Sequence, residues 1–304
     1  MTTPLFDTRH IRHAFSRAAG SYDAAAALQH EVEARLLESL DYLEDRQPRA
    51  VLDLGCGPGR AAMAMRQRWP RARVLAVDLA LPMLHAAKLS SSKLPWWRLR
   101  KPVERICADA RALPFADNTV DVLFSSLCLQ WVEDLPAVFA GFRRVLRPGG
   151  LLLLSSFGPD TLHELRAAFA EAEQFSPEPA PHVSPFASIA QVGDALMHAG
   201  FRNPVLDRDA MTTRYADLPA LMRELRAIGA TNALRSRRST LTGKSRFARA
   251  ADAYEVDRRD DGTLPASWEI ITAMAWAPDA GAPIREAGAE IAQFPADRIP
   301  IRRR

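Results

Sequence analysis

Three glycines at alternate positions, Gly55, Gly57 and Gly59, form a turn directly after an apolar segment that contains Asp53. Glycine has no side chain, so its backbone can come close to a bound ligand. The G-x-G-x-G spacing differs from the G-x-G-x-x-G of dinucleotide-binding loops. A carboxylate beside the turn gives little to a phosphate group but attracts a cation. These residues indicate a binding site for a small molecule that carries a positive charge.

The glycine turn lies between a predicted strand and a predicted helix. Residues 50–54 are apolar apart from Asp53, as in a buried strand, and residues 61–65 begin a helix-forming run. A strand, a glycine turn and a helix start a Rossmann-type unit, in which ligands bind at the carboxyl end of the strand. A turn that merely needs glycine is the simpler alternative, and the neighbouring acid argues against it.

Further predicted strands would bring polar residues to the same edge of the sheet. Residues 73–78 end in Asp78, which in such a sheet can accept both hydroxyl groups of a ribose. A helix cap on the surface is the alternative for Asp78. Residues 105–110 are the third predicted strand with the turn that follows it, and residues 120–126 are the fourth. Their alternation with helices predicts a mostly parallel sheet.

The composition is that of an ordinary globular protein. The 304 residues carry a formal net charge of +4 and include no apolar run near the ~20 residues of a membrane-spanning helix. The N-terminus lacks the basic start and apolar core of a secretion signal. Cys56, Cys107 and Cys128 are odd in number and lack metal-ligand spacing. We therefore expect a cytoplasmic protein without a metal, a disulfide framework or membrane insertion.

The chain divides into three expected parts. Apolar residues recur at every fourth position from Leu28 to Leu40 and predict one helix before the first strand. Two late strands are expected at 204–215 and 266–276, and the roughly fifty residues between them are too many for a loop. The expected division is 1–45 for an N-terminal lid and helix, 46–279 for the α/β domain with a helical insertion at about 216–265, and 280–304 for a flexible tail.

The glycine turn and its acid resemble motif I of the class I S-adenosylmethionine (SAM) methyltransferases. The resemblance implies an α/β, Rossmann-like, seven-stranded sheet that is mostly parallel with an antiparallel last strand. It implies that Asp53 orders the turn near the ammonium group of SAM and that Asp109 reaches the adenine amino group. A short aromatic segment often covers the SAM site in these enzymes, so Tyr22 is a candidate lid residue with a catalytic contact, and simple packing is its alternative. The cofactor-binding candidates are Asp53, Gly55, Cys56, Gly57, Gly59, Asp78, Leu79, Asp109, Ala110 and Ser126.

Further blocks are similar to the malonyl-[acyl-carrier protein] O-methyltransferase family of biotin synthesis. The similarity covers residues from about 10 to 278 and includes residues 127–131 and 157–162. Pro58 departs from the Thr or Ser that is frequent there, and proline still allows the turn. The resemblance implies methyl transfer from SAM to the free carboxylate of a malonyl thioester, carried by acyl carrier protein or by coenzyme A.

A malonyl carboxylate would need no general base. Its pKa near ~4 keeps it ionised at neutral pH, and residues 127–131 contain no His, Lys or Glu that could accept a proton. Catalysis would then depend on aligning oxygen, methyl carbon and sulfur and on excluding water. Arginine suits a carboxylate because its donors form a bidentate pair. The substrate candidates are Trp131, Arg17, Arg143, Arg144 and Arg166.

A basic stretch in the insertion is a candidate docking site for acyl carrier protein, which is generally acidic. A solvated helical face is the alternative. The stretch has no interleaved aromatic residues to stack on bases, so no nucleic-acid partner is expected. The docking candidates are Arg235, Arg237, Arg238, Lys244, Arg246 and Arg249.

Three other functions stay open at this point. The chain could methylate another small acid or a quinone precursor. It could instead be a SAM-dependent assembly factor or hydroxylating protein that acts on a protein partner. A nicotinamide-dependent dehydrogenase is the third alternative, and the glycine spacing and Asp53 argue against it.

Overall fold

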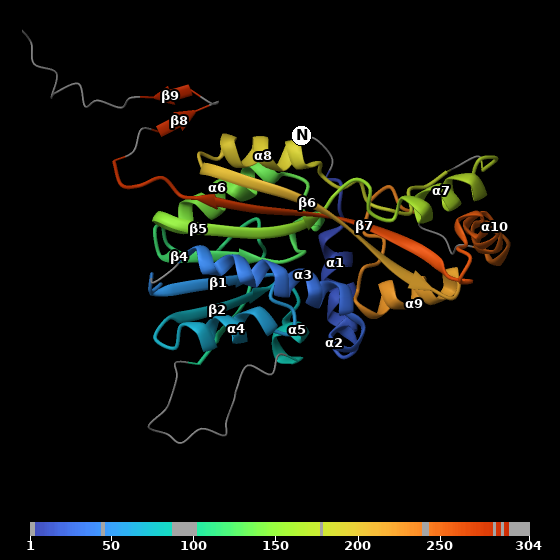
Figure 1. Cartoon of the computed structure of the whole chain (residues 1–304), viewed down its shortest axis with the longest axis horizontal. Helices are drawn as coiled ribbons and strands as arrows, with labels where there is room; N and C mark the ends of the chain where they lie inside the picture. Colours follow the sequence, from blue (N-terminus) through green and yellow to red (C-terminus); the bar gives the residue numbers. More distant parts are fainter. Residues whose placement is uncertain are drawn as a thin grey trace, which may run out of the picture.

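A seven-stranded sheet in the order β3-β2-β1-β4-β5-β7-β6 forms the centre of the computed structural model (Figure 1). The structure describes residues 4–43, 46–86, 102–176, 179–238 and 243–281, and the backbone of 284–286 and 289–291. Neighbouring strands are parallel except at β7, which is antiparallel to both β5 and β6. This confirms the expected α/β fold with an antiparallel last strand. The strands are β1 (Ala50–Leu54), β2 (Arg73–Asp78), β3 (Glu104–Cys107), β4 (Val120–Ser125), β5 (Leu146–Phe157), β6 (Arg202–Tyr215) and β7 (Leu264–Trp276), with β8 (Ile284–Glu286) and β9 (Ala289–Ile291) in a separate pair.

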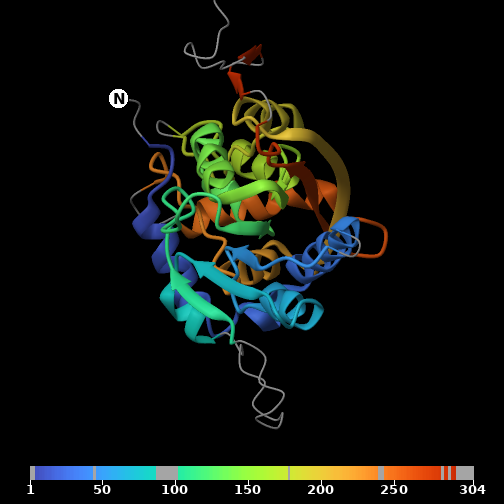
Figure 2. The ribbon, with the colours of Figure 1, turned by 90° about the vertical axis from the view of Figure 1, so that its left-hand side faces the viewer.

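Helices cover both faces of the sheet (Figure 2). Successive side chains of a strand point to opposite faces, so β1 is buried on both. Leu52 and Leu54 belong to a core cluster with α6 (Leu135–Val145) and α8 (Ile189–His198). Val51 belongs to the opposite cluster with α3 (Ala27–Glu38) and α4 (Arg60–Arg68). The burial of β1 on both faces therefore reflects a sheet between two helical layers.

The N-terminal segment and the residues between β6 and β7 meet beside the sheet (Figure 1). Phe6 forms an isolated β-bridge with Leu234, and the hydroxyl of Ser21 donates to the carbonyl of Ala227 at 2.7 Å. The helices involved are α1 (Thr8–Ala18), α2 (Tyr22–Ala25), α9 (Leu218–Ala227) and α10 (Lys244–Tyr254).

A third core cluster joins these added helices to the sheet. Leu221 of α9, Tyr254 of α10 and Phe169 of α7 (His163–Ala172) are buried in it with Trp268 of β7. The remaining helix is α5 (Leu81–Ala86), which follows β2. None of the helices in the described ranges is both long and apolar enough to span a membrane. Of the tail expected at 280–304, the structure describes residues 280–281 and the paired strands β8 and β9, and the other residues lie outside the described ranges.

Candidate functional site

A pocket of about 790 Å³, measured with its open mouth, lies at the carboxyl ends of the parallel strands. Strands β1 and β4 are neighbours there, and the chain order of the sheet reverses between them. Such a switch point is where ligands bind in open α/β sheets. The walls are Thr8, Ile11, Phe15, Tyr22, Leu54, Gly55, Gly57, Asp78, Leu79, Met83, Ala108, Asp109, Ala110, Arg111, Ser126, Leu127, Cys128, Trp131 and Val132.

The glycine turn brings its backbone against the pocket. Gly55 has a φ of +71°, and a Cβ built there would lie 2.6 Å from both the Cβ and the Sγ of Cys128. Only glycine fits this position, because a side chain would be strained and would overlap its neighbour. The amide of Gly57 donates to Asp78 at 2.9 Å, so the turn is fixed to the end of β2.

Two acids predicted to bind a cofactor occupy different environments. Asp78 lines the pocket, accepts hydrogen bonds from the amides of Gly57 and Ala80, and has a pKa raised by burial. Asp53 is 2% exposed and accepts from the amide of Ala62 at 2.8 Å in the first turn of α4. Burial and then the charge of Glu33 raise the pKa of Asp53 well above its usual value. Asp53 therefore contacts the first turn of α4 and lies outside the wall of the pocket.

Tyr22 closes one side of the pocket next to the glycine turn. A Cβ at Gly57 would lie 3.8 Å from the Tyr22 ring. Burial, followed by the charges of Asp78 and Glu33, raises the pKa of the Tyr22 phenol. Burial also raises the pKa of the Cys128 thiol to about 12. Both groups therefore keep their protons at neutral pH and can donate hydrogen bonds.

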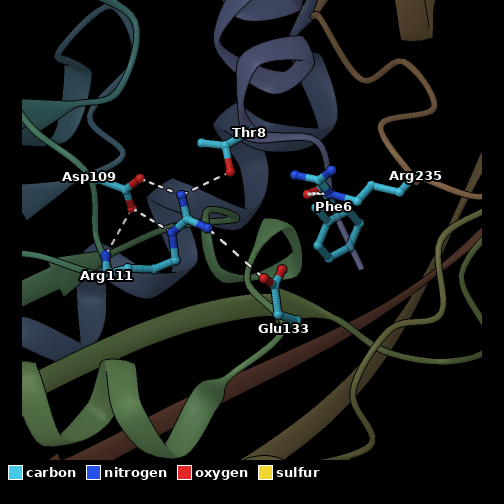
Figure 3. Close-up of polar contacts among 6 residues, drawn as sticks. All are labelled: Phe6, Thr8, Asp109, Arg111, Glu133 and Arg235. Carbon is cyan, nitrogen blue, oxygen red and sulfur yellow. Dashed lines mark hydrogen bonds and ion pairs between the residues drawn. The ribbon is translucent and has the colours of Figure 1, made fainter. Parts of the chain in front are cut away.

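Arg111 connects three parts of the pocket mouth (Figure 3). Its guanidinium donates to both carboxylate oxygens of Asp109, at 3.0 and 2.6 Å, and to the hydroxyl of Thr8 at 2.9 Å. Glu133 lies 4.0 Å from the same guanidinium. Hydrogen bonding to Arg111 lowers the pKa of Asp109. The first residue of α1 is thus held over the loop that follows β3.

A second cavity adjoins the first at Trp131, which lines both. Its walls are mainly apolar and come from α7, α9, β7 and the loop before α8. Arg226, Arg237, Arg238 and His182 add basic groups. The cavity has a volume of about 1240 Å³, again with its open mouth.

Most of the predicted arginines lie outside the pocket. Arg144 donates to the carbonyls of Leu113 and Phe115 at the far end of α6, and Arg166 donates to the carbonyls of Pro159 and Thr161. Arg143 lines none of the described cavities, and Arg17 lines a separate groove between α1 and α9. Trp131 is the one substrate candidate in the wall of the pocket.

The basic stretch makes contacts with the rest of the protein. Arg237 pairs with Asp7 at 3.0 Å, and Arg235 donates to the carbonyl of Phe6. Arg246 pairs with the buried Glu173 at 3.2 Å. Arg249 donates to the carbonyl of Ala172. Arg238 lines the second cavity, and Lys244 is exposed at the start of α10.

Several wall residues were not predicted as site residues. Arg111 stands two positions after Asp109, and this spacing is its only signal in the sequence. Thr8, Ile11 and Phe15 come from α1, and their i, i+3, i+7 spacing indicates only that one face is covered. Of the cofactor candidates, Asp53, Cys56 and Gly59 lie outside the wall, whereas the other seven line it.

The sheet order and the pocket at its switch point define a class I methyltransferase. The family model described as "Methyltransferase domain" matches residues 52–154. The BH2331 protein of Bacillus halodurans has the same fold, with a TM-score of 0.56, 17% identity, and coverage of 81% of this chain and 99% of that one. A phosphoethanolamine N-methyltransferase 2 of Haemonchus contortus, solved with SAM, matches with a TM-score of 0.50, 19% identity, and coverage of 81% and 53%.

Curated relatives narrow the class. A malonyl-[acyl-carrier protein] O-methyltransferase of Xylella fastidiosa is 62% identical over 99% of this chain and 98% of its own length. The malonyl-[acyl-carrier protein] O-methyltransferase 1 of Coxiella burnetii is 35% identical over 98% and 97%. The chain belongs to the malonyl-[acyl-carrier protein] O-methyltransferase family.

Proposed function

We propose that this protein transfers a methyl group from SAM to the free carboxylate of a malonyl group on acyl carrier protein, an early step of biotin synthesis. The observation that carries this proposal is that the glycine-cradled pocket meets the acceptor at Tyr22, Cys128 and Trp131, which we call the acceptor side, and that none of these three described residues is ready to take a proton. Tyr22 and Cys128 stay protonated because burial raises the pKa of each. A carboxylate is the acceptor that needs no base, since it is ionised at neutral pH.

The pocket fits SAM by its shape and its donors and acceptors. Gly55 and Gly57 leave room for the backbone to meet a ligand, and Asp78 stands at the strand end where a ribose would lie. We propose that Asp109 and Ala110 meet the adenine and that Leu79 and Ser126 complete the contact, as the sequence predicts. Bound SAM would supply an electrophilic methyl group on a sulfonium.

The chain's own contribution is orientation and exclusion of water. Tyr22 can donate a hydrogen bond to the acceptor, and this would hold a carboxylate oxygen in place without removing a proton. Trp131 packs edge-on against Phe6 and Phe15, with ring centroids 6.3 and 5.6 Å away. The N-terminal segment thus places aromatic rings beside the acceptor side of the pocket. These rings exclude water, and a carboxylate that is less hydrated is a better nucleophile.

The second cavity is the proposed binding site of the arm, by which we mean the chain that joins the malonyl thioester to its carrier. Its apolar walls suit an extended chain, and Trp131 connects it to the pocket. Arg237 and Arg238 line this cavity, so they are better placed to meet the substrate than Arg143, Arg144 or Arg166. A chain lying in the cavity would reach the pocket at Trp131.

The test is release of S-adenosylhomocysteine from SAM with malonyl-acyl carrier protein against acetyl-acyl carrier protein. Turnover with the malonyl form alone is expected, because only it presents a free carboxylate. Equal turnover with both forms, or none with either despite SAM binding, would overturn the proposal and favour the protein-directed alternative.

We also propose the cytoplasm as the place of action and retain the expected division of the chain. The three cysteines are unpaired, which suits a reducing compartment. For the division, α9 and α10 lie between β6 and β7, and α1 to α3 precede β1.

A further inference from the structure

A groove between α1 and α9 is lined by basic side chains. Its ionisable wall residues are His10, His13, Arg17, Arg223 and Arg226, and no acidic residue of the described chain lines it. The charge comes from two helices that are far apart in sequence. An acidic partner is therefore the complementary occupant.

Two guanidinium groups of the groove are available to such a partner. Arg17 and Arg226 are exposed, and neither forms an ion pair with any residue that the structure describes. Arg223 stands 4.0 Å from Asp217, with both side chains exposed, so this pair is weak. His10 lies 3.3 Å from the hydroxyl of Thr231, and burial lowers its pKa, so it is neutral at neutral pH.

The groove lies next to the second cavity and shares wall residues with it. Arg226 and Thr231 line both of them. Trp131 in turn lines both the second cavity and the glycine-cradled pocket. Groove, cavity and pocket therefore adjoin in that order, from the surface to the acceptor side.

We propose that the groove between α1 and α9 docks the acidic face of acyl carrier protein, so that the arm enters the second cavity past Arg226 and Thr231 and presents its carboxylate at Trp131. The inference rests on the proposed function, since it takes malonyl-acyl carrier protein as the substrate. In this arrangement, acyl carrier protein binds a surface next to the cavity that its arm enters.

The basic stretch at 235–249 is less suited to this role. The charges of Arg237 and Arg246 are met by Asp7 and Glu173, and Arg235 and Arg249 donate to backbone carbonyls. A partner would have to displace these contacts. The groove offers cations that a partner can pair without that cost.

The test compares the double variant Arg17→Glu/Arg226→Glu with the control Lys244→Glu, an exposed charge of the basic stretch. Two quantities are measured at low ionic strength: the KM for malonyl-acyl carrier protein, and the anisotropy-derived Kd of labelled holo-acyl carrier protein. We expect both to rise about tenfold or more in the double variant, with a weaker salt dependence, and to change less than about twofold in the control. Unchanged values in the double variant, or an equal rise in the control, would overturn the docking site.

Three further measurements distinguish the loss of docking from misfolding, from weaker binding of the arm and from an incorrect proposed function. SAM affinity reports folding, and if the double variant loses it, the single variant Arg223→Glu decides the question. Malonyl-coenzyme A carries an arm without the protein, and Arg17 lines the groove but not the second cavity. A KM rise for malonyl-coenzyme A in Arg17→Glu as large as that for malonyl-acyl carrier protein would therefore overturn docking of the protein face. Wild-type protein that binds holo-acyl carrier protein in the groove but does not methylate its malonyl form would overturn the proposed function and leave the docking site standing.

Discussion

Arg111 holds Asp109 in a two-point contact, with Nε and one terminal nitrogen donating to the two carboxylate oxygens at 3.0 and 2.6 Å. The same terminal nitrogen reaches Thr8 at the start of α1 (Figure 3). The loop after β3 is thus tied to the N-terminal segment. Because α1 supplies part of the wall, this contact joins two sides of the pocket.

Replacing Arg111 by alanine should weaken SAM binding. The pair is about one third exposed, so solvent screens it, and we expect the Kd for SAM to rise about two- to fivefold. Titration calorimetry measures the change, and Arg9→Ala on the exposed side of α1 is the matched control. Equal affinities for the Arg111 variant and wild type would show that the tie does not close the pocket.

The Arg111 contact also sets a pH dependence. The pKa of Asp109 is lowered in the folded protein, so its contribution to stability is present above the unfolded pKa of ~3.9 and is lost as the pH falls through the folded pKa. Wild type should therefore lose its stability advantage over Asp109→Asn below about pH 4. Urea unfolding at pH 7 and pH 3 tests this, and an advantage of the same size at both values would contradict it.

The glycine turn should tolerate alanine differently at each position. Gly55→Ala combines a positive φ with overlap on Cys128, and we expect a loss of unfolding free energy of about 2–4 kcal/mol together with weaker SAM binding. Gly200→Ala has a φ of +81° in open space, so it should cost only the backbone strain of about 1–2 kcal/mol. Gly20→Ala meets no atom within 4 Å at an ordinary φ and serves as the neutral control. Denaturant unfolding that ranks the three equally would refute the overlap.

Turnover should not require a base near neutral pH. The pKa of Cys128 is raised to about 12 and that of Tyr22 is raised as well, so neither ionises there. We expect a flat kcat between about pH 6 and 9, because the acceptor carboxylate is already ionised. Tyr22→Phe should lower kcat about tenfold without changing this shape, since it removes one hydrogen-bond donor. A rise in kcat with a midpoint near 7 that disappears in Tyr22→Phe would instead identify Tyr22 as a general base.

Asp53 should stabilise the fold through the hydrogen bond that its carboxylate oxygen accepts and not through its negative charge. The folded pKa of Asp53 is raised, so the folded state holds its proton more tightly, and wild type loses stability as the pH rises above ~4. Asp53→Asn keeps an acceptor for the Ala62 amide and should gain on wild type as the pH rises from 5 to 8. Asp53→Ala removes the acceptor and should cost about 1–3 kcal/mol. Equal losses in both variants, measured by unfolding at the two pH values, would show that the charge is what matters.

Local patterns were enough to predict the strands and the part of the pocket wall that lies at their carboxyl ends. Apolar runs predict buried strands, and the carboxyl ends of parallel strands meet at one edge, so Gly55, Asp78, Asp109 and Ser126 lie together as expected. The substrate arginines could not be predicted in the same way. In the sequence, Arg144 and Arg166 look like any surface arginine. Only the structure shows that Arg144 donates to the distant carbonyl of Leu113 and that Arg166 donates to the nearby carbonyl of Thr161.

The sequence by itself determined the α/β sheet, the glycine turn and the family, because each can be recognised from residues that are neighbours in the chain. Only the tertiary structure decided which arginine side chains stay available to bind a partner. Asp7 and Arg237 pair across the fold, whereas Arg17 and Arg226 line one groove that has no carboxylate among its described wall residues. Periodicity in the sequence predicts which face of each helix is buried. Which side chains meet depends on the long-range packing of the N-terminal segment against the insertion, and this packing is determined by residues of both segments together.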